Sequence, residues 1–209
     1  MKTVKKLSFV ILTTLTLGMT YAQKIDAKAK TILDAVANNY KSKQNTYFKF
    51  LYGTGSGKVT KNEVGIFYAS QNKYKLKIMG QEQIFDGKKV YSISAEDQEV
   101  TIAKPNGNEA AFSPLNYIDT YKTGYNVSYL GKRNGLDFIR LVPVKNNGIH
   151  QVLLYVNSAK KQMVKIEQHA SNKDIAVITV SQYKENQSLN PTMFSFNKAD
   201  YKNYLITEL

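Results

Sequence analysis

Residues 65–102 constrain the fold more than any other part of this 209-residue chain. Within them, lysines alternate with Tyr74, Leu76 and Ile78. A period of two puts successive side chains on opposite faces of a β-strand, so this strand has one apolar face and one charged face. Asp86-Gly87, between two apolar runs, supplies the positive φ angles of a tight hairpin turn. The stretch therefore predicts a meander of antiparallel strands with an apolar face that must be covered.

The first 22 residues have the organisation of a secretory signal peptide. Three lysines precede an apolar run at residues 7–17, and Thr20-Tyr21-Ala22 is typical of a cleavage site. The run is too short to span a bilayer as a helix, which takes about 20 residues. We expect residues 1–22 to be removed and residues 23–209 to form a single exported domain. Because the chain has no cysteine, it can form no disulfide and offers no thiol for lipid attachment.

The chain is basic, with a formal charge of +13 that falls to +10 when the three lysines of the leader are lost. Such a charge favours anionic surfaces, including phospholipid head groups and nucleic acid. The lysines, however, are spread along nearly every segment without a run of five or six. This distribution favours solvated strand faces, which keep a β-rich protein soluble. Export argues further against a nucleic-acid partner.

The pattern along the chain predicts two helices within a long series of strands. Residues 24–43 carry apolar side chains at helical spacing, and Ser113-Pro114 has the form of an N-cap followed by the first residue of a short helix. Strands are predicted at residues 47–52, 64–70, 74–79, 83–85, 89–94, 99–103, 126–130, 138–142, 151–156, 163–168, 174–183, 193–196 and 204–206. One large antiparallel sheet of this kind must curl to bury its apolar face, as a barrel or half-barrel. An incompletely closed barrel leaves room for a ligand.

No constellation of catalytic or metal-binding residues is recognisable. His150 and His169 fall on separate predicted strands with no further ligand at a suitable spacing. The glycine-rich residues 53–58 lack the spacing of a P-loop and are predicted to form a hairpin connection. We therefore predict no catalytic residue, no metal and no cofactor. The fifteen tyrosines and nine phenylalanines indicate a core of large rings, some of which have a polar tip suited to a cavity mouth.

Several motifs, taken in order, resemble the LolA family of periplasmic outer-membrane lipoprotein carriers. They are an amphipathic first helix, Gly65-Ile66-Phe67-Tyr68, the hairpin at residues 84–91, Ser113-Pro114-Leu115 and Phe194-Ser195-Phe196. The resemblance implies an α+β, mainly antiparallel half-barrel of about 11 strands that is unclosed and capped by helices. It also implies a periplasmic monomer whose hydrophobic interior shelters lipoprotein acyl chains. Its partners would be acylated lipoproteins, an inner-membrane release transporter, an outer-membrane acceptor and, transiently, the membrane.

The resemblance also assigns site residues. It carries the aromatic strand positions of the family onto Tyr74 and Leu76 and, after the turn, onto Tyr91 and Ile93. The residues predicted to line the acyl-chain cavity are Phe48, Phe50, Phe67, Tyr74, Leu76, Ile78, Ile84, Tyr91, Ile93, Val100, Ile102, Leu154, Val156 and Ile178, and the predicted lid consists of Leu115, Tyr117, Ile118 and Tyr121. Residues 70–73 lack the arginine that precedes a proline in the well-studied carriers, where it holds the lid shut.

Two alternatives remain open at this point. The missing arginine favours a binding module of the same fold for another lipid or hydrophobic ligand, or an envelope sensor. A secreted hydrolase would require reactive groups brought together from distant segments.

Overall fold

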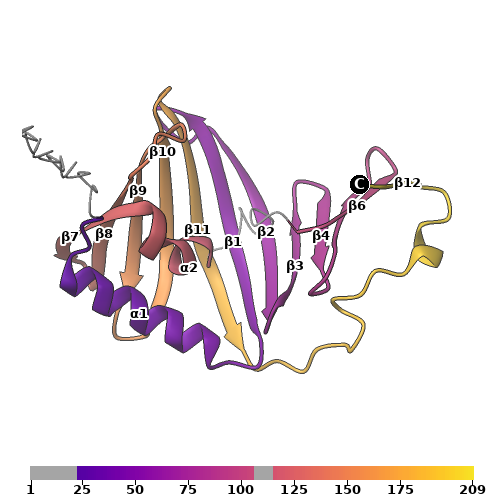
Figure 1. Cartoon of the computed structure of the whole chain (residues 1–209), viewed down its shortest axis with the longest axis horizontal. Coiled ribbons are helices and arrows are strands. Elements are labelled where there is room, and N and C mark those ends of the chain that lie inside the picture. The colour runs from indigo at the N-terminus through magenta and orange to yellow at the C-terminus, as the bar shows by residue number, and fades with distance from the viewer. Residues whose placement is uncertain (1–22, 106–114) are drawn as a thin grey trace, which may run out of the picture.

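The structure is a computed structural model that describes residues 23–105 and 115–209. Twelve strands in these ranges form one continuous sheet (Figure 1). They are β1 (Thr46–Ser56), β2 (Lys61–Ser70), β3 (Lys73–Ile78), β4 (Gln81–Phe85), β5 (Val90–Ser94), β6 (Glu99–Ala103), β7 (Tyr125–Arg133), β8 (Leu136–Pro143), β9 (Ile149–Asn157), β10 (Gln162–Ala170), β11 (Asp174–Glu185) and β12 (Leu205–Glu208). Their order in the sheet is β12-β6-β5-β4-β3-β2-β1-β11-β10-β9-β8-β7.

The sheet is antiparallel throughout, except that β12 pairs in parallel with β6. β12 and β7 lie at its two edges and do not pair with each other, so the sheet is unclosed. The predicted α+β, mainly antiparallel and unclosed architecture is confirmed. Two predictions within it are wrong. Residues 193–196 are not in a strand. Most of residues 53–58 is not a connection, because β1 continues through Gly53 and Gly55 to Ser56 and pairs there with β11.

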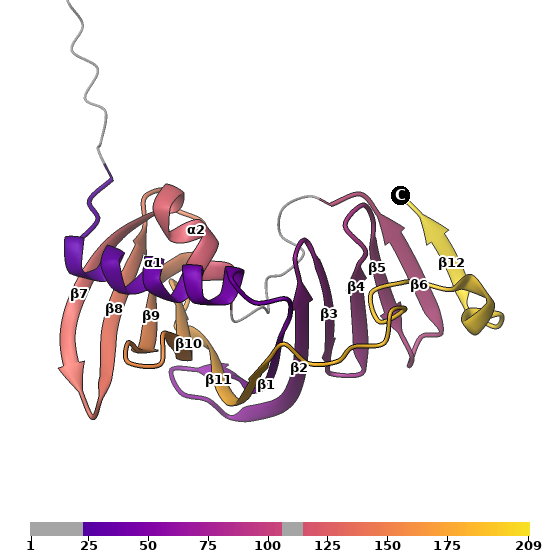
Figure 2. The ribbon, with the colours of Figure 1, turned by 90° about the horizontal axis from the view of Figure 1, so that it is seen from below.

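Two helices, α1 (Ala27–Lys41) and α2 (Asn116–Gly124), lie across one face of the sheet over β7–β11 (Figures 1 and 2). The Asp26 carboxylate caps α1 by accepting a hydrogen bond from the Ala29 amide at 2.9 Å. Every third or fourth residue of α1 faces the sheet and is buried: Ala29, Leu33, Val36, Ala37 and Tyr40. The helix is shorter than the predicted residues 24–43, since Ile25 instead forms a parallel bridge with Val127 of β7.

Two sets of sequence predictions lie outside the described residues. These are the signal peptide at residues 1–22 and the Ser113-Pro114 start of the second helix. Within the described part of the chain, α2 begins at Asn116, and the backbone amide of Ile118 donates to the Leu115 carbonyl at 2.9 Å.

The sheet carries two separate hydrophobic cores. The larger core lies on the sheet face that the helices cover, and it extends along this face from β7–β11 to β1–β3. The smaller core contains Ile84, Ile93 and Val100 of β4–β6, with Phe196 and Tyr201 from the C-terminal segment packed against it. That segment runs from the end of β11 past β2, β3 and β4 to β12 (Figure 2). Figure 1 shows that α1 and α2 lie over the β7–β11 part of the sheet and not over β4–β6.

Candidate functional site

The face of the sheet that α1 and α2 cover, called the inner face below, carries most of the residues predicted to bind a ligand. Tyr40 of α1 connects helix and sheet, because its ring lies 5.5 Å from Phe48 and its hydroxyl accepts the Met163 amide at 2.8 Å. Nine of the fourteen predicted cavity residues belong to the larger core, which lies on this face: Phe48, Phe50, Phe67, Tyr74, Leu76, Ile78, Leu154, Val156 and Ile178. Strand register aligns several of them across the sheet, since Phe48 lies opposite Phe67 and Phe67 opposite Leu76.

The other five predicted cavity residues point away from the inner face. They are Ile84, Tyr91, Ile93, Val100 and Ile102, and they all belong to the smaller core or pack against it. The predicted placement of all fourteen in one cavity is therefore corrected. The reason is the register: Leu76 pairs with Gln83, so it is Gln83 and not Ile84 that continues the inner face into β4. The apolar side of β4–β6 is covered instead by the C-terminal segment, whose Phe196 stacks on Tyr91 at 4.7 Å.

A cavity of about 380 Å³ opens at one end of the helix-covered region. Its apolar walls include Tyr40 of α1, Ala69 of β2 and Leu115 and Ile118 at α2, and lysine and amide side chains form its rim. We call it the mouth cavity. Its volume falls in the range of about 300–1,000 Å³ that is typical of ligand pockets. A second cavity of about 400 Å³ lies at the other end of the same strands, beside Tyr52 and Gln168.

Between these two cavities the inner face is filled by side chains of the helices. Leu33 and Val36 of α1 and Tyr121 of α2 are fully buried there. The predicted lid residues Tyr117, Ile118 and Tyr121 all belong to this core, and Leu115 packs against it. A ligand longer than the mouth cavity would therefore have to displace helix side chains to reach this part of the inner face.

Several polar contacts attach α2 to its surroundings. Two of them involve its backbone, because Nε2 of Gln23 donates to the Tyr121 carbonyl at 2.9 Å and the Val144 amide donates to the Gly124 carbonyl at 2.9 Å. The Tyr117 hydroxyl donates to Oε1 of Gln168 on β10 at 2.6 Å. The Tyr121 hydroxyl donates to Oδ1 of Asp34 on α1 at 2.8 Å, and Nζ of Lys122 lies 2.6 Å from the same oxygen. The side chains of Lys122 and Asp34 are 50% and 25% exposed, so the ion pair lies at the surface. Asp34 thus connects α2 to α1, a function that sequence reasoning missed because helical spacing placed Asp34 only on the polar face.

The charges around Asp34 favour its ionised form. Hydrogen bonds from Lys122 and Lys30, followed by that from Tyr121, hold the pKa of the Asp34 carboxyl well below its usual range. Burial and the hydrogen bond to Asp34 raise the pKa of the Tyr121 hydroxyl, so this hydroxyl stays protonated and donates. The connection between α1 and α2 is therefore an ionised carboxylate, Asp34, that accepts hydrogen bonds from lysine side chains and from the Tyr121 hydroxyl.

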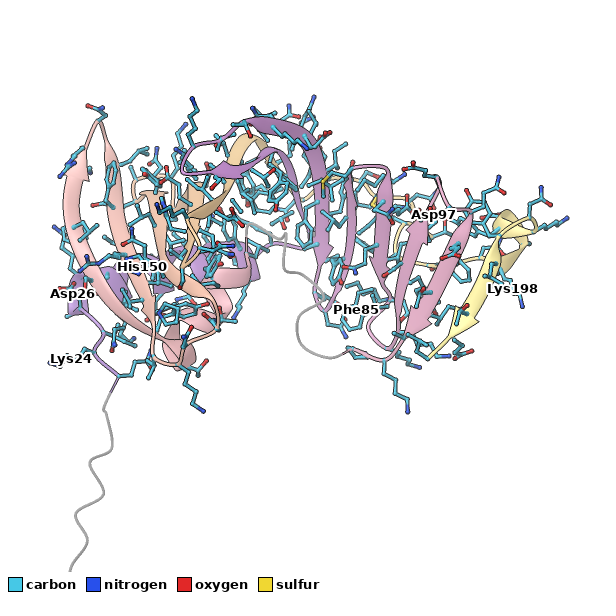
Figure 3. All side chains as sticks on the ribbon, turned by 90° about the horizontal axis from the view of Figure 1, so that it is seen from above. Lys24, Asp26, Phe85, Asp97, His150 and Lys198 are labelled. Atoms are coloured by element: carbon cyan, nitrogen blue, oxygen red, sulfur yellow. The ribbon has the colours of Figure 1, made fainter. Side chains whose placement is uncertain are left out.

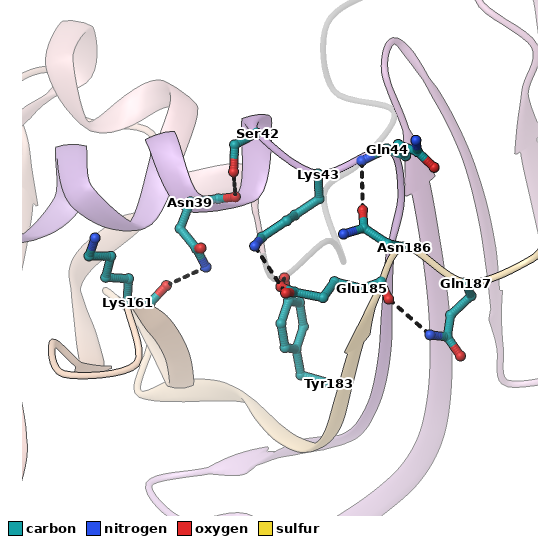
Figure 4. A network of polar contacts seen from close by, with 9 residues as sticks. All are labelled: Asn39, Ser42, Lys43, Gln44, Lys161, Tyr183, Glu185, Asn186 and Gln187. Carbon is teal, nitrogen blue, oxygen red and sulfur yellow. Dashed lines mark hydrogen bonds and ion pairs between the residues drawn. The ribbon is translucent and has the colours of Figure 1, made fainter.

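The rim of the mouth cavity is fixed by a polar network between the α1–β1 connection and the end of β11 (Figure 4). Nζ of Lys43 lies 3.0 Å from Oε1 of Glu185, and the backbone amide of Gln44 donates to Oδ1 of Asn186 at 2.9 Å. Asn45, also on the rim, is buried and exchanges hydrogen bonds with the backbone of Gln187 at 2.8 and 2.9 Å. The rim is thus attached to the end of β11 by an ion pair and by hydrogen bonds.

The two histidines and a further cavity lie away from the mouth cavity. Within residues 23–105 and 115–209, no group of three or more His, Asp and Glu side chains could hold a metal ion. His150 is exposed on β9 (Figure 3), and His169 contacts Glu167 at 3.3 Å. A further cavity of about 790 Å³ lies on the opposite, outer face of the sheet, where Lys75 and Lys77 both pair with Glu82. In the same described ranges, no helix is both long and apolar enough to cross a membrane.

Comparison with known proteins decides the family. The family model described as "Outer membrane lipoprotein carrier protein LolA" matches residues 52–197. The chain belongs to the LolA family. The match extends from β1 through the C-terminal segment, so it includes most of the inner face of this LolA-family protein.

Solved structures are similar to this chain at low sequence identity. An uncharacterised conserved protein from Thermus thermophilus has a TM-score of 0.63 and 12% identity, with 87% of this chain and 99% of that chain covered. A LolA superfamily protein from Nitrosomonas europaea has a TM-score of 0.44 and 12% identity over 80% and 97% of the two chains. Lipoprotein LppX from Mycobacterium tuberculosis has a TM-score of 0.45 and 10% identity over 79% and 98%. No curated protein sequence matches the chain.

Proposed function

We propose that this LolA-family protein is a periplasmic carrier that takes the acyl chains of lipoproteins onto its inner face and escorts them from the inner to the outer membrane. The carrier performs no chemical step. It receives cargo from an inner-membrane release transporter and delivers it to an acceptor at the outer membrane. Export through a cleavable leader at residues 1–22 is part of this proposal.

One observation carries the proposal: a wide apolar sheet face is covered by a short helix that a few polar contacts hold in place. Nine predicted cavity residues lie on this face. Tyr117, Tyr121 and Lys122 of α2 make side-chain contacts with the sheet or with α1, and the mouth cavity lies beside the start of the helix. In this proposal, the arrangement in which α2 covers the inner face is the closed state of the carrier.

The energetics of acyl transfer explain why a movable cover is useful. Each methylene kept from water contributes about 0.8 kcal/mol, so one chain of roughly 14 carbons represents on the order of 11 kcal/mol. A carrier must supply a comparable apolar surface and still release its cargo. Side chains of α2 occupy that surface when no cargo is bound, which keeps the open and closed states within a few kcal/mol of each other.

The test is co-isolation of lipoproteins with the purified protein. We expect Leu76→Glu to lose them, since Leu76 lies on the inner face and is 4% exposed. Leu51→Glu makes the same substitution at an exposed outer position of β1 and should retain cargo. Because a buried glutamate can unfold the protein, Ala69→Phe, which narrows the mouth cavity without adding charge, serves as a second variant. Equal recovery from wild type, Leu76→Glu and Ala69→Phe would exclude the carrier function.

A second candidate is a binding module or envelope sensor for a smaller hydrophobic ligand. The observation that favours it is the size of the mouth cavity, about 380 Å³, beside an inner face filled by helix side chains. Native mass spectrometry of protein isolated from its own cells separates the two candidates. A bound free lipid supports the second, and an acylated protein supports the carrier.

A further inference from the structure

The inner face changes its chemistry between β3 and β4. On β3 it presents Tyr74, Leu76 and Ile78, and the register places them opposite Phe85, Gln83 and Gln81 of β4. The same rows continue into β5 and β6, where three of the six side chains carry a hydroxyl group: Ser92, Ser94 and Thr101. The uncharged polar positions on this part of the inner face are Gln81, Gln83, Ser92, Ser94 and Thr101, which we call the polar patch.

The polar patch adjoins the apolar route from the mouth cavity. Ala69, in the wall of that cavity, lies opposite Tyr74, and the row continues through Phe85 and Val90. The polar residues occupy the neighbouring rows, toward the turn that contains Asp97. Figure 3 shows Phe85 and Asp97 at opposite ends of this part of the sheet. An elongated molecule on the inner face can thus contact apolar side chains along one row and hydrogen-bonding groups along the next.

Hydrogen bonds within the patch hold its side chains in order. The Tyr74 hydroxyl donates to Oε1 of Gln83 at 2.8 Å, and Nε2 of Gln83 donates to the Ser92 hydroxyl at 3.3 Å. Nε2 of Gln81 donates to the Ser94 hydroxyl at 3.0 Å. A carboxamide can make about four hydrogen bonds. Side-chain contacts of Gln83 with the described residues use two, so it retains capacity for a ligand.

Among the described residues, the inner face of β4–β6 has no cationic side chain that could pair with an anionic head group. Among the described positions of β3–β6, the lysines lie on the outer face, as Lys75 and Lys77 do beside Glu82. The inner positions of β4–β6 include one charged residue, Glu99, which pairs with Ser94 in the register. A phosphate or carboxylate on the patch would lose water without gaining a counter-ion, which is costly. Gln83 and Ser92 are half-buried, so a head group seated there is partly removed from water.

We propose that the polar patch binds the uncharged, hydrogen-bonding head of an amphiphile whose acyl chain enters through the mouth cavity. Sugar hydroxyls and peptide-like amides share the required chemistry, because each offers donors and acceptors without charge. The proposal rests on the proposed function, since it assumes that the inner face receives an acyl chain. It adds selection of the head group to the recognition of the chain.

Titration calorimetry with three decyl amphiphiles, below their micelle concentrations, tests the proposal on the purified protein. Decyl maltoside and N-decanoylglycinamide carry the two kinds of neutral head, and decyl phosphate carries an anionic one. We expect at least one neutral compound to bind about tenfold or more tightly than the phosphate. A few hydrogen bonds that the phosphate head group loses to water and does not regain on the patch account for a difference of this size. The neutral compound that binds more tightly shows whether the patch recognises a sugar or an amide head group.

Two variants locate the effect. Gln83→Lys places a cation in the patch and should tighten decyl phosphate binding by about tenfold. Gln182→Lys makes the same change at an exposed position of β11, opposite Lys49 on the outer face, and should leave all three affinities unchanged. Ser92→Ala, which adds no charge, should weaken the preferred neutral compound several-fold and not the phosphate.

The outcomes separate this inference from the proposed function. Equal affinity for the three amphiphiles overturns the head-group selection and leaves the acyl-chain carrier standing. Equal responses to Gln83→Lys and Gln182→Lys also overturn it. Failure of every amphiphile to bind folded wild type contradicts both proposals. Thermal unfolding of each variant shows that a loss of binding does not come from a loss of structure.

Discussion

At the residue scale, Gly65 on β2 is where the inner face tolerates no added atom. A Cβ at Gly65 would lie 2.2 Å from Cζ of Phe50, which is itself fully buried. Because the rings of the core leave Phe50 little room to move, we expect Gly65→Ala to lower the free energy of unfolding by about 1–3 kcal/mol. Urea unfolding followed by far-UV circular dichroism measures the change.

Gly124→Ala is the matched control for this prediction. A Cβ at Gly124, at the end of α2, would meet nothing within 4 Å, so the stability of the Gly124→Ala variant should stay close to that of wild type. If Gly65→Ala were as stable as Gly124→Ala, the close packing of Phe50 over β2 would be refuted.

Asp34 is the residue whose charge connects the two helices, and its effect depends on pH. Its folded-state pKa is lowered, mainly by Lys122 and then by Lys30. A carboxyl with a lowered pKa stabilises the fold above its unfolded pKa, about 3.9, and this stability is lost as the pH falls through the folded value. We therefore expect Asp34→Asn to be less stable than wild type at neutral pH, with the difference shrinking below about pH 4.

Urea midpoints measured across this pH range check the sign. Asp200→Asn removes an exposed carboxylate in the C-terminal segment and provides the control for a general effect of charge. A constant difference between Asp34→Asn and wild type at all pH values would mean that the ion pair with Lys122 does not stabilise the fold.

At the element scale, the C-terminal segment replaces a helix as the cover of β4–β6. Phe196 stacks between Tyr91 of β5 and Tyr201, with ring centroids 4.7 and 5.2 Å apart. We expect Phe196→Ala to cost about 2 kcal/mol, through lost burial and ring contacts. The loss should be local, so amide hydrogen exchange should become faster in β5 and β6 and change little in β9 and β10.

Tyr47→Ala serves as the control, because Tyr47 is also half-buried and also packs on a ring, that of Tyr68 at 4.9 Å, but lies on β1 outside the smaller core. Faster exchange in β5 and β6 in both variants, or in neither, would contradict a separate core under the C-terminal segment.

The strand patterns show how far the sequence could predict this site. On β3, lysines occupy one face completely, so alternation alone identified Tyr74, Leu76 and Ile78 as one apolar face, and the register places this face on the inner side of the sheet. On β4–β6 each strand also has one apolar side, and we assigned the residues on that side to the same cavity. Alternation gives two faces without saying which one meets the helices; that depends on the hairpin register and on a segment about 100 residues later in the chain.

The predicted helices show a similar limit. The helical spacing in α1 identified its buried face, including Leu33 and Val36, because core packing repeats every three to four residues. Asp34 falls between them on the polar side, and only the three-dimensional position of α2 reveals its contacts with Tyr121 and Lys122. The mouth cavity could not be predicted either, since it is formed by segments distant in the sequence, such as Tyr40, Ala69 and Ile118.

At the scale of the whole molecule, one sheet combines two differently covered parts. The part under α1 and α2 has an apolar inner face, and the part backed by the C-terminal segment has a polar one. The sheet itself is continuous and hydrogen-bonded throughout, whereas α2 is held mainly by side-chain contacts. The element free to move without breaking the sheet is therefore α2, and loading should change its position while the strands stay in register.

Spin labels can detect this movement because the chain has no cysteine of its own. Labels at Thr123→Cys on α2 and Ala159→Cys in the β9–β10 turn use two exposed positions away from the inner face. We expect one narrow distance distribution in the free protein and a longer, broader one with an acylated peptide bound. Combining Asp34→Asn with Tyr117→Phe should broaden the distribution without ligand, since both substitutions remove contacts that hold α2. The pair Ala159→Cys and Asn172→Cys, in two turns of the sheet, should give the same distances with and without ligand. If the peptide binds and the distance to α2 does not change, this helix is not the lid.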